Sequence, residues 1–419
     1  MTATPAQTEA TSLWRNGDFL RFWFGETVSL LGSQVTALAL PLTAISAFQA
    51  TDEQVGVLRF LQLVPYLGLA LLFGVWVDRS RRRHVMLSAN LARLVLIGLV
   101  PLLYFLDLLT LPLLLALACA IGIASVLFDV SWMAYVPTLV KGPSQYVEAG
   151  AKLSMSSSAA DVAGPGLAGL LISAATAPIA LVVDAISYLA SVLSLLTIRT
   201  PERRPDGVRR KVGPDLREGL GWVFGNPLLR WLALIGFCCN FSMITVWTLF
   251  LLFGTHDLRL SAGMLGIVFS SASVGGLLGA VSARRVIQRF PLGRAYLTGQ
   301  TMLLLGPGLL LLAPGFATVP ICIASFFVTY LGLGVAGVII VSLRQTLTPQ
   351  HLMARMTAAF RTLLFGGGAL GGLAAGVLSG AVGTGTALLI IAGASASMVV
   401  PLLFSPVVRL QRLPDPPGA

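Results

Sequence analysis

The sequence of 419 residues has few charged side chains: Asp, Glu, Lys and Arg together make up 11%. Soluble domains usually carry about 25%. Hydrophobic residues make up 56%, and the mean hydropathy is +0.86. So little charge cannot cover the surface of a chain this long in water, which excludes a cytosolic enzyme. The composition instead predicts a protein that is embedded in a lipid bilayer.

Residues that build catalytic and metal sites are also scarce. The sequence has three histidines and four cysteines, and it contains no Walker loop, HExxH or CxxC motif. We therefore expect no enzymatic activity, no cofactor, no metal site and no direct use of ATP. The cysteines all fall inside apolar runs, where we expect buried and inert thiols; they are Cys119, Cys238, Cys239 and Cys322.

Long apolar runs dominate what is present. A membrane span needs about 20 apolar residues, and twelve runs of that kind predict an all-α membrane protein. The first six are 19–46, 54–77, 85–106, 111–135, 150–174 and 178–198. The last six are 228–253, 262–283, 295–313, 317–341, 356–380 and 385–405. We expect an N-terminal six-helix bundle at 1–198, a cytoplasmic linker at 199–226 and a C-terminal six-helix bundle at 227–419.

The positive charges follow a topological pattern. The net charge is +11, and all Lys and Arg residues except Arg59 and Arg259 fall in or beside alternate loops. The positive-inside rule places those loops and both termini in the cytoplasm. We expect a multi-pass protein of a bacterial cytoplasmic membrane. Because the charges are spread over many short loops, the lipid bilayer is the expected partner and nucleic acid is not.

The two halves of the sequence repeat one another. The fifth predicted span contains GPGLAGLLIS from Gly164, and the eleventh contains GGLAAGVLSG from Gly371. Parallel repeats of this kind are typical of secondary transporters, whose substrate site lies between the halves near the middle of the membrane.

A motif between the second and third spans resembles the signature of the major facilitator superfamily. It runs Gly74-Val-Trp-Val-Asp78-Arg79-Ser-Arg81-Arg82-Arg83, with Arg81 where the family usually has glycine. The resemblance implies two pseudo-symmetric six-helix bundles, alternating access and a monomer. It also implies a cytoplasmic gate that consists of Gly74, Asp78, Arg79, Arg82, Arg83, Asp129 and Arg361.

Within that gate, each residue has an expected role. Asp78 is expected to latch the halves together, facing Arg355 and Arg361 at the start of the eleventh span. We expect Gly74 to let the second span approach a neighbour closely. Asp129 is expected to be the acidic partner of the arginine cluster. A plain positive-inside anchor remains the alternative explanation of the arginines.

The fifth span contains a second family-like motif. Gly164, Pro165 and Gly169 resemble the antiporter signature of drug-exporting members, in which Ala160 and Ala168 here replace glycines. The sequence most resembles the macrolide-efflux and siderophore-exporter (enterobactin-exporter-like) branch of drug:proton antiporters. Small residues one turn apart form a groove, and proline bends a helix, so we expect this span to rock against a partner.

Charged side chains within spans are costly and usually functional. Glu26 and Asp161 are the proton-coupling candidates, because a carboxylate in a low-dielectric site can exchange protons near neutral pH. A buried ion pair explains either residue equally well, and Asp184 is expected to be structural.

The resemblance implies that spans one, four, seven and ten line the substrate path. Aromatic and methionine surfaces accept bulky amphipathic ligands, although helix packing explains most such residues too. The substrate-binding candidates on these spans and on span two are Gln34, Gln62, Tyr66, Asn240, Phe241, Met243, Trp247 and Tyr330.

The function expected from the sequence is export of a bulky amphipathic small molecule (a drug, a macrolide-like compound or a siderophore) by proton antiport. A proton-coupled importer of a small metabolite is one alternative. A non-transporting membrane scaffold is the other.

Overall fold

The computed structural model describes residues 13–140, 142–202, 212–313 and 317–414, which form helices and connecting turns without a β-strand. The first half contains η1 (Leu13–Arg15), α1 (Gly17–Phe48), α2 (Asp52–Leu63), α3 (Pro65–Arg79), α4 (Arg82–Phe105), α5 (Leu111–Leu139), α6 (Pro143–Ala174) and α7 (Ala177–Thr197). The second contains α8 (Val212–Gly225), α9 (Pro227–His256), α10 (Ala262–Arg289), α11 (Leu292–Leu305), η2 (Gly306–Leu312), α12 (Thr318–Leu347), η3 (Gln350–Leu352), α13 (Met353–Val382), α14 (Thr384–Ser397), α15 (Val399–Leu403) and η4 (Pro406–Arg409).

Ten helical segments of the described chain are long and apolar enough to cross a membrane, and they match ten of the predicted spans. The predicted second span is α2 followed by α3, because Pro65 lacks a backbone N–H and starts a new helix. The predicted fifth span is α6, which is 32 residues long but carries a serine run at 156–158. Both pack against the other half, α2 on α13 and α6 on α10, so they need less apolar surface than lipid-facing helices.

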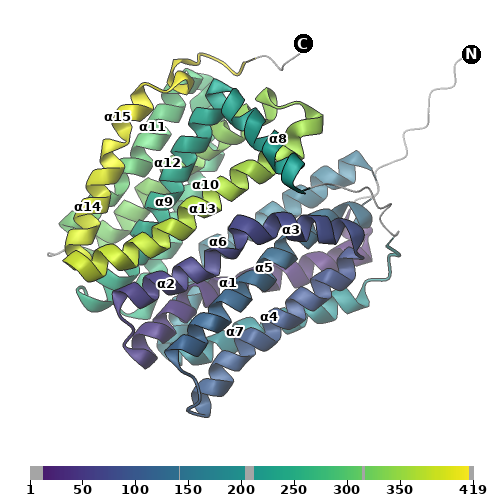
Figure 1. Ribbon diagram of the computed structural model, residues 1–419, viewed down its shortest axis with the longest axis vertical. Helices are drawn as coiled ribbons and strands as arrows, with labels where there is room; N and C mark the ends of the chain where they lie inside the picture. The colour runs from purple at the N-terminus through teal and green to yellow at the C-terminus, as the bar shows by residue number, and fades with distance from the viewer. Residues whose placement is uncertain (1–12, 141, 203–211, 314–316, 415–419) are drawn as a thin grey trace, which may run out of the picture.

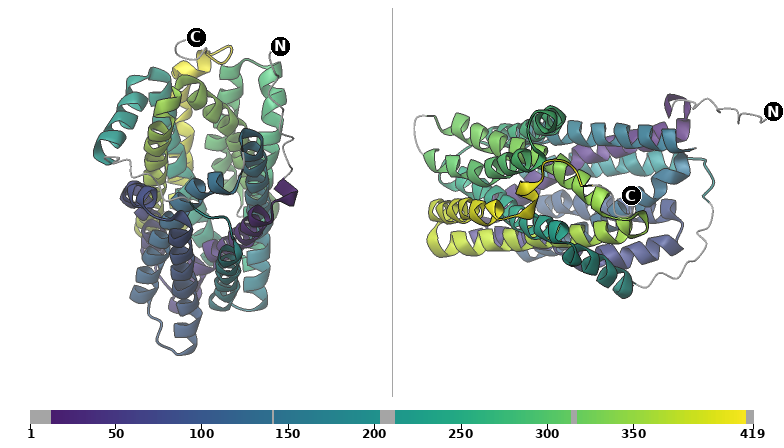
Figure 2. Two further views of the ribbon diagram at one scale, coloured as in Figure 1. Left: turned by 90° about the vertical axis from the view of Figure 1, so that its right-hand side faces the viewer. Right: turned by 90° about the horizontal axis from the view of Figure 1, so that it is seen from above.

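The helices form two groups (Figure 1). α1–α7, drawn from purple to blue-green, form one group and α8–α15, drawn from teal to yellow, form the other, and α2 and α6 also pack extensively across the boundary between them. Both termini lie at one end of the molecule (Figure 2). We call this end, which also holds the arginine-rich α3–α4 turn, the basic end. The other end holds the α1–α2, α6–α7 and α13–α14 turns, and we call it the opposite end.

The polar stretch between the halves contains the short helix α8 at the basic end. α8 packs on α13 and α9, with Val223 fully buried. Arg355 of α13 forms an ion pair with Glu218 of α8. Residues 203–211 of this stretch lie outside the described residues.

At the opposite end, polar contacts join the two halves. Thr51 and Gln54 form a capping box that starts α2, which places Asp52 in its first turn. The carboxylate of Asp52 accepts a hydrogen bond from Ser379 of α13, and its Oδ1 lies 3.5 Å from Nδ1 of His256 at the end of α9. One carboxylate of the first half therefore contacts two helices of the second.

Glycines bring the backbones of the halves into contact at the same end. A Cβ atom on Gly56 of α2 would collide with the main chain of Gly376 of α13. A Cβ atom on Gly169 of α6 would collide with the main chain at Ala262 and Gly263 of α10. Because no side chain separates these helices, the opposite end is tightly closed.

Candidate functional site

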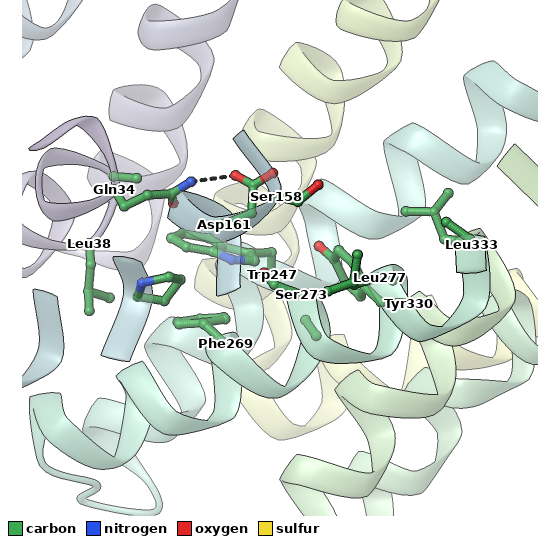
Figure 3. Close-up of a pocket in the computed structure, with 15 residues that line it drawn as sticks. Gln34, Leu38, Ser158, Asp161, Trp247, Phe269, Ser273, Leu277, Tyr330 and Leu333 are labelled. Atoms are coloured by element: carbon green, nitrogen blue, oxygen red, sulfur yellow. Dashed lines mark hydrogen bonds between the residues drawn. The ribbon is translucent and has the colours of Figure 1, made fainter. Parts of the chain in front are cut away.

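A cavity of about 470 Å³ lies between the halves, bounded by α1, α6, α9, α10 and α12 (Figure 3). We call it the central cavity. Four sequence candidates line it, together with Pro165: they are Gln34, Asp161, Trp247 and Tyr330. Sequence analysis missed other lining residues, including Ser158, Phe269 and Ser273. Phe269 and Ser273 belong to α10, which the family resemblance did not assign to the substrate path.

Asp161 is held in the central cavity by a chain of contacts that begins at a glycine. Its Oδ1 accepts a hydrogen bond of 2.6 Å from Nε2 of Gln34 (Figure 3). A Cβ atom on Gly164 would occupy the space of the aliphatic part of the Gln34 side chain. Gly164 therefore leaves room for Gln34 to cross from α1 to the carboxylate on α6.

An aromatic wall faces this carboxylate. The rings of Trp247 and Phe269 stack with centroids 4.5 Å apart. The guanidinium of Arg59 lies 4.7 Å from the centroid of the Trp247 ring, and its Nη1 donates a hydrogen bond of 3.1 Å to Gln62. Among the described residues that line the central cavity, Asp161 is the one Asp, Glu, Lys or Arg. The cavity thus combines a single formal negative charge with flat apolar surfaces.

A second cavity, of about 310 Å³, lies inside the first half between α1, α2, α3, α4, α5 and α7. We call it the N-half cavity. Much of its lining is polar or charged, and it includes Glu26, Ser29, Ser33, Thr36, Arg59, Gln62, Tyr66, Arg93, Asp129 and Tyr188. The sequence candidates Gln62 and Tyr66 belong to this cavity rather than to the central one.

Glu26 is buried in this lining without an ion-pair partner among the described residues. Glu26 is 6% exposed, and its Oε2 atom is fully buried and forms no hydrogen bond. Arg93 lies nearby but packs its guanidinium on the rings of Phe128, at 4.0 Å, and Tyr188, at 4.5 Å, and donates to Asn90. Glu26 therefore forms no ion pair with an arginine of the described chain, and its proton-coupling role stays a prediction.

Asp184 shows the contrasting arrangement. It is fully buried and accepts hydrogen bonds from Thr36 and, at 2.9 Å, from Ser187. It lines neither cavity. The hydrogen bond from Thr36 fastens α1 to α7, in keeping with the structural role expected for Asp184.

A third cavity, of about 550 Å³, lies at the basic end between α1, α5, α6 and α13. We call it the vestibule. Glu26 and Asp129 line both the vestibule and the N-half cavity. Oδ2 of Asp129 lies 3.3 Å from Nη2 of Arg361 and accepts a hydrogen bond of 2.8 Å from the hydroxyl of Tyr66. Asp129 thus contacts Arg361 of the second half rather than the arginine cluster of the gate motif, which corrects the partner expected from the sequence.

The arginine cluster has a different acidic partner. The main-chain N–H groups of Arg82 and Arg83 donate to the carboxylate of Glu202, at 2.7 and 3.2 Å. The guanidinium of Arg83 donates to the carbonyls of Leu195 and Leu196. These contacts tie the α3–α4 turn to the end of α7, within one half of the protein.

The roles expected for Gly74 and Asp78 in the gate have different outcomes. The prediction that Gly74 allows close helix approach is wrong, because a Cβ atom there would meet nothing within 4 Å. The side chain of Asp78 lies outside the described residues, so the latch assigned to it stays a prediction. Arg79 is exposed at the basic end of α3.

Three candidates on α9 do not reach the central cavity. The side-chain oxygen of Asn240 lies against Gly368 of α13. The carbonyl of Phe241 faces Gly371 of α13, and Met243 packs into the apolar core of the second half. α9 therefore presents only Trp247 of the predicted set to the central cavity.

Comparisons with known proteins agree with the helical fold. The model of the Major Facilitator Superfamily matches residues 22–372. The chain is 25% identical over 411 residues to "Multidrug efflux pump Tap" of Mycolicibacterium fortuitum, covering 94% of this chain and 97% of the relative. It is 25% identical over 386 residues to the protein of that name from Mycobacterium tuberculosis (strain ATCC 25618 / H37Rv), covering 86% of each.

Solved structures share the fold. The nucleoside transporter NupG superposes with a TM-score of 0.73 at 12% identity, covering 93% of this chain and 98% of that one. A bacterial homolog of the human lysosomal transporter Spinster, inward-facing and unoccupied, gives a TM-score of 0.67 at 16% identity, covering 93% and 94%. At such low identity, these likenesses concern the fold alone.

Proposed function

We propose, since the chain belongs to the Major Facilitator Superfamily, that this transporter is a proton-driven exporter of bulky, amphipathic, drug-like molecules. Similarity along nearly the full chain to a multidrug efflux pump supports this substrate class. Macrolide-like compounds and siderophores belong to the same broad class of bulky cargo. The observation that carries the proposal is the central cavity, in which one carboxylate faces an aromatic wall between two helix groups.

The proposed direction of transport follows from the two ends of the molecule. The halves touch backbone to backbone at the opposite end, whereas the vestibule lies between them at the basic end. We place the basic end, with both termini, in the cytoplasm of a bacterial cell, as the positive-inside rule requires. Cargo then enters through the vestibule and leaves after the glycine contacts at the opposite end separate. A single chain, acting as a monomer, contains the whole path.

Proton coupling is assigned to the carboxylates that lie within the spans. A charged group within a membrane protein is costly unless it is used or paired. Glu26 lacks an ion-pair partner among the described residues, and Asp161 is hydrogen-bonded to a neutral amide. Both can therefore change protonation without breaking an ion pair.

Transport in everted membrane vesicles tests the proposal. With a proton gradient, acidic inside, vesicles that contain the protein should accumulate ethidium, and a protonophore should abolish the accumulation. Vesicles from cells that carry the empty vector measure the background accumulation. Proton-dependent loss of ethidium from the vesicle lumen would indicate import instead, and no proton-dependent movement of any drug-like cation would contradict the proposal.

A further inference from the structure

We infer that Arg59 of α2 holds the opposite end closed until cargo binds, and that an aromatic cargo releases it by taking its place on the ring of Trp247. The inference rests on the proposed function and adds a gating residue whose contact the cargo itself breaks. It follows from where this arginine lies between the two halves.

Arg59 has no charged partner among the described residues. An arginine within a membrane span is costly unless it is paired or used, yet Arg59 forms none of the ion pairs of the described chain. Its Nη1 donates to the neutral amide of Gln62 at 3.1 Å, and its Nε is buried without a hydrogen bond. Its guanidinium carbon lies 4.7 Å from the centroid of the Trp247 ring of α9. The charge is therefore placed on an aromatic ring of the other half.

α13 of the second half leaves room for this side chain. A Cβ atom on Gly372 would lie 2.9 Å from Cγ and 3.0 Å from Cβ of Arg59, closer than such atoms pack. One turn of α2 further toward the opposite end, Gly56 meets the main chain of Gly376. Arg59 thus lies between this backbone contact and the central cavity, at the inner edge of the closed end.

The contact covers a surface that cargo needs. Trp247 lines the central cavity, and its ring also stacks on Phe269 (Figure 3). A flat cargo molecule that stacks on Trp247 therefore competes with the guanidinium of Arg59. A ligand shifts a conformational equilibrium only by binding one state better than the other. Cargo binds better once α2 has moved away from Trp247, so its binding favours the state that is open at the opposite end.

The displaced guanidinium has an alternative place within its own half. Arg59 also lines the N-half cavity, together with Gln62, Ser29 and Ser33. The amide and hydroxyl oxygens of such residues accept hydrogen bonds from a guanidinium. Arg59 therefore exchanges a contact with the second half for contacts inside the first when cargo arrives. It returns to Trp247 when the cargo leaves, and the opposite end closes again.

Spin-label distances without cargo test this contact by itself. Purified full-length protein, with its native cysteines replaced by alanine, carries labels at Leu108 and Arg259, which are exposed at the opposite end in different halves. Arg59→Gln should raise the ratio of open to closed protein about tenfold, as expected for loss of a desolvated contact between a cation and a ring. Arg344→Gln is the matched control and should leave the ratio unchanged, because Arg344 lies over Phe360 within the second half.

Two other variants test the same contact independently. Arg59→Lys keeps the charge but lacks the plane that covers the ring, so it should open the end less than Arg59→Gln does. Trp247→Leu removes the ring and should open the end as Arg59→Gln does. The double variant should open it no further, because both changes break one contact. Each variant must elute as a single folded species before it is measured.

Cargo affinity distinguishes this role from a merely structural one. Arg59→Gln should bind ethidium about tenfold more tightly than the native protein, because nothing has to be displaced from Trp247. Removal of a residue that only supports the fold would weaken binding instead. In the Trp247→Leu background the gain should vanish. If the gain persists there, repulsion of the cationic probe explains it, and the inference is overturned.

The inference is also overturned if the cargo-free distances of Arg59→Gln match those of the native protein, or if Arg344→Gln changes them equally. These distances need neither cargo nor a proton gradient. Failure of the proposed function is therefore a separate result: the native protein would show no proton-driven movement of any drug-like cation, while the label distances would still respond to Arg59→Gln.

Discussion

Arg361 of α13 and Asp129 of α5 form an ion pair between the two halves, with 3.3 Å between Nη2 and Oδ2. Tyr66 supports it from both sides: its hydroxyl donates to Asp129, and its ring stacks on Phe365 of α13 with centroids 4.2 Å apart. The two charged side chains are 30% and 31% exposed. At that exposure such a pair contributes at most about 1 kcal/mol, which suits the gate contact that the proposed transport cycle would break.

The first prediction concerns this contact. Asp129→Asn should increase the population that is open at the basic end about fivefold, which corresponds to the loss of about 1 kcal/mol. Electron-spin distances between labels at His84 and Arg289, both exposed near the basic end, measure the populations. The native cysteines are first replaced by alanine. Asp129→Glu keeps the charge and is the control, and an unchanged distance distribution in Asp129→Asn would refute a gating role for the pair.

A second prediction concerns the opposite end. Asp52 accepts a hydrogen bond from Ser379 and faces His256, so Asp52→Ala removes both contacts between the halves. We expect a larger outward-open population and faster labelling of a cysteine that replaces a buried residue beside the glycine contact, for example in Ala375→Cys. His256→Gln keeps the hydrogen bond to Ser379 and should have a smaller effect. If Asp52→Ala labels no faster than the native background, the polar contacts do not hold this end closed.

The third prediction concerns Gly164. In Gly164→Ala the new methyl group displaces the Gln34 side chain and breaks its hydrogen bond to Asp161, so affinity for a cationic substrate should fall about fivefold. In Gln34→Ala, adding Gly164→Ala should cause little further loss, because the obstructed side chain is gone. Gly150→Ala, on the same helix and with nothing within 4 Å of the new Cβ, is the matched control. Additive losses in the double variant would show that the glycine acts elsewhere.

The fourth prediction concerns the contact between α6 and α10. Gly169→Leu places a large side chain where the main chain of Ala262 and Gly263 lies. The opposite end can then no longer close, so we expect the variant to bind substrate from the outside and to lose net transport. Distances between labels at Leu108 and Arg259, both exposed at this end, should lengthen. Unchanged distances together with normal transport would contradict the assigned role of this contact.

The sequence predicts the span pattern well because hydropathy and the distribution of arginines are local properties. Of its candidates, the substrate-binding residues Gln34, Trp247 and Tyr330 and the proton-coupling residue Asp161 line one cavity, since embedded polar groups must face the interior. It fails for Asn240, Phe241 and Met243. α9 is apolar on most of its surface, so its periodicity does not reveal which face meets the substrate path.

The sequence also does not determine which charged residues contact one another. Asp129 lies close to the basic end like the gate arginines, yet it contacts Arg361, more than two hundred positions away. Glu202, which follows α7, instead accepts hydrogen bonds from the main-chain N–H groups of Arg82 and Arg83. Such pairings depend on how far each helix is rotated and shifted, which composition and spacing leave open. The break between α2 and α3 was missed because apolar residues continue through it, although Pro65 was a visible signal.

The most direct test of the account records cargo and protons together in liposomes that contain the protein. An internal pH dye follows protons while an electrode follows external tetraphenylphosphonium. The account predicts that an imposed proton gradient drives the probe in the direction opposite to the protons, and that a probe gradient drives protons in return. Movement of the probe and protons in the same direction, or probe movement that ignores the proton gradient, would contradict it.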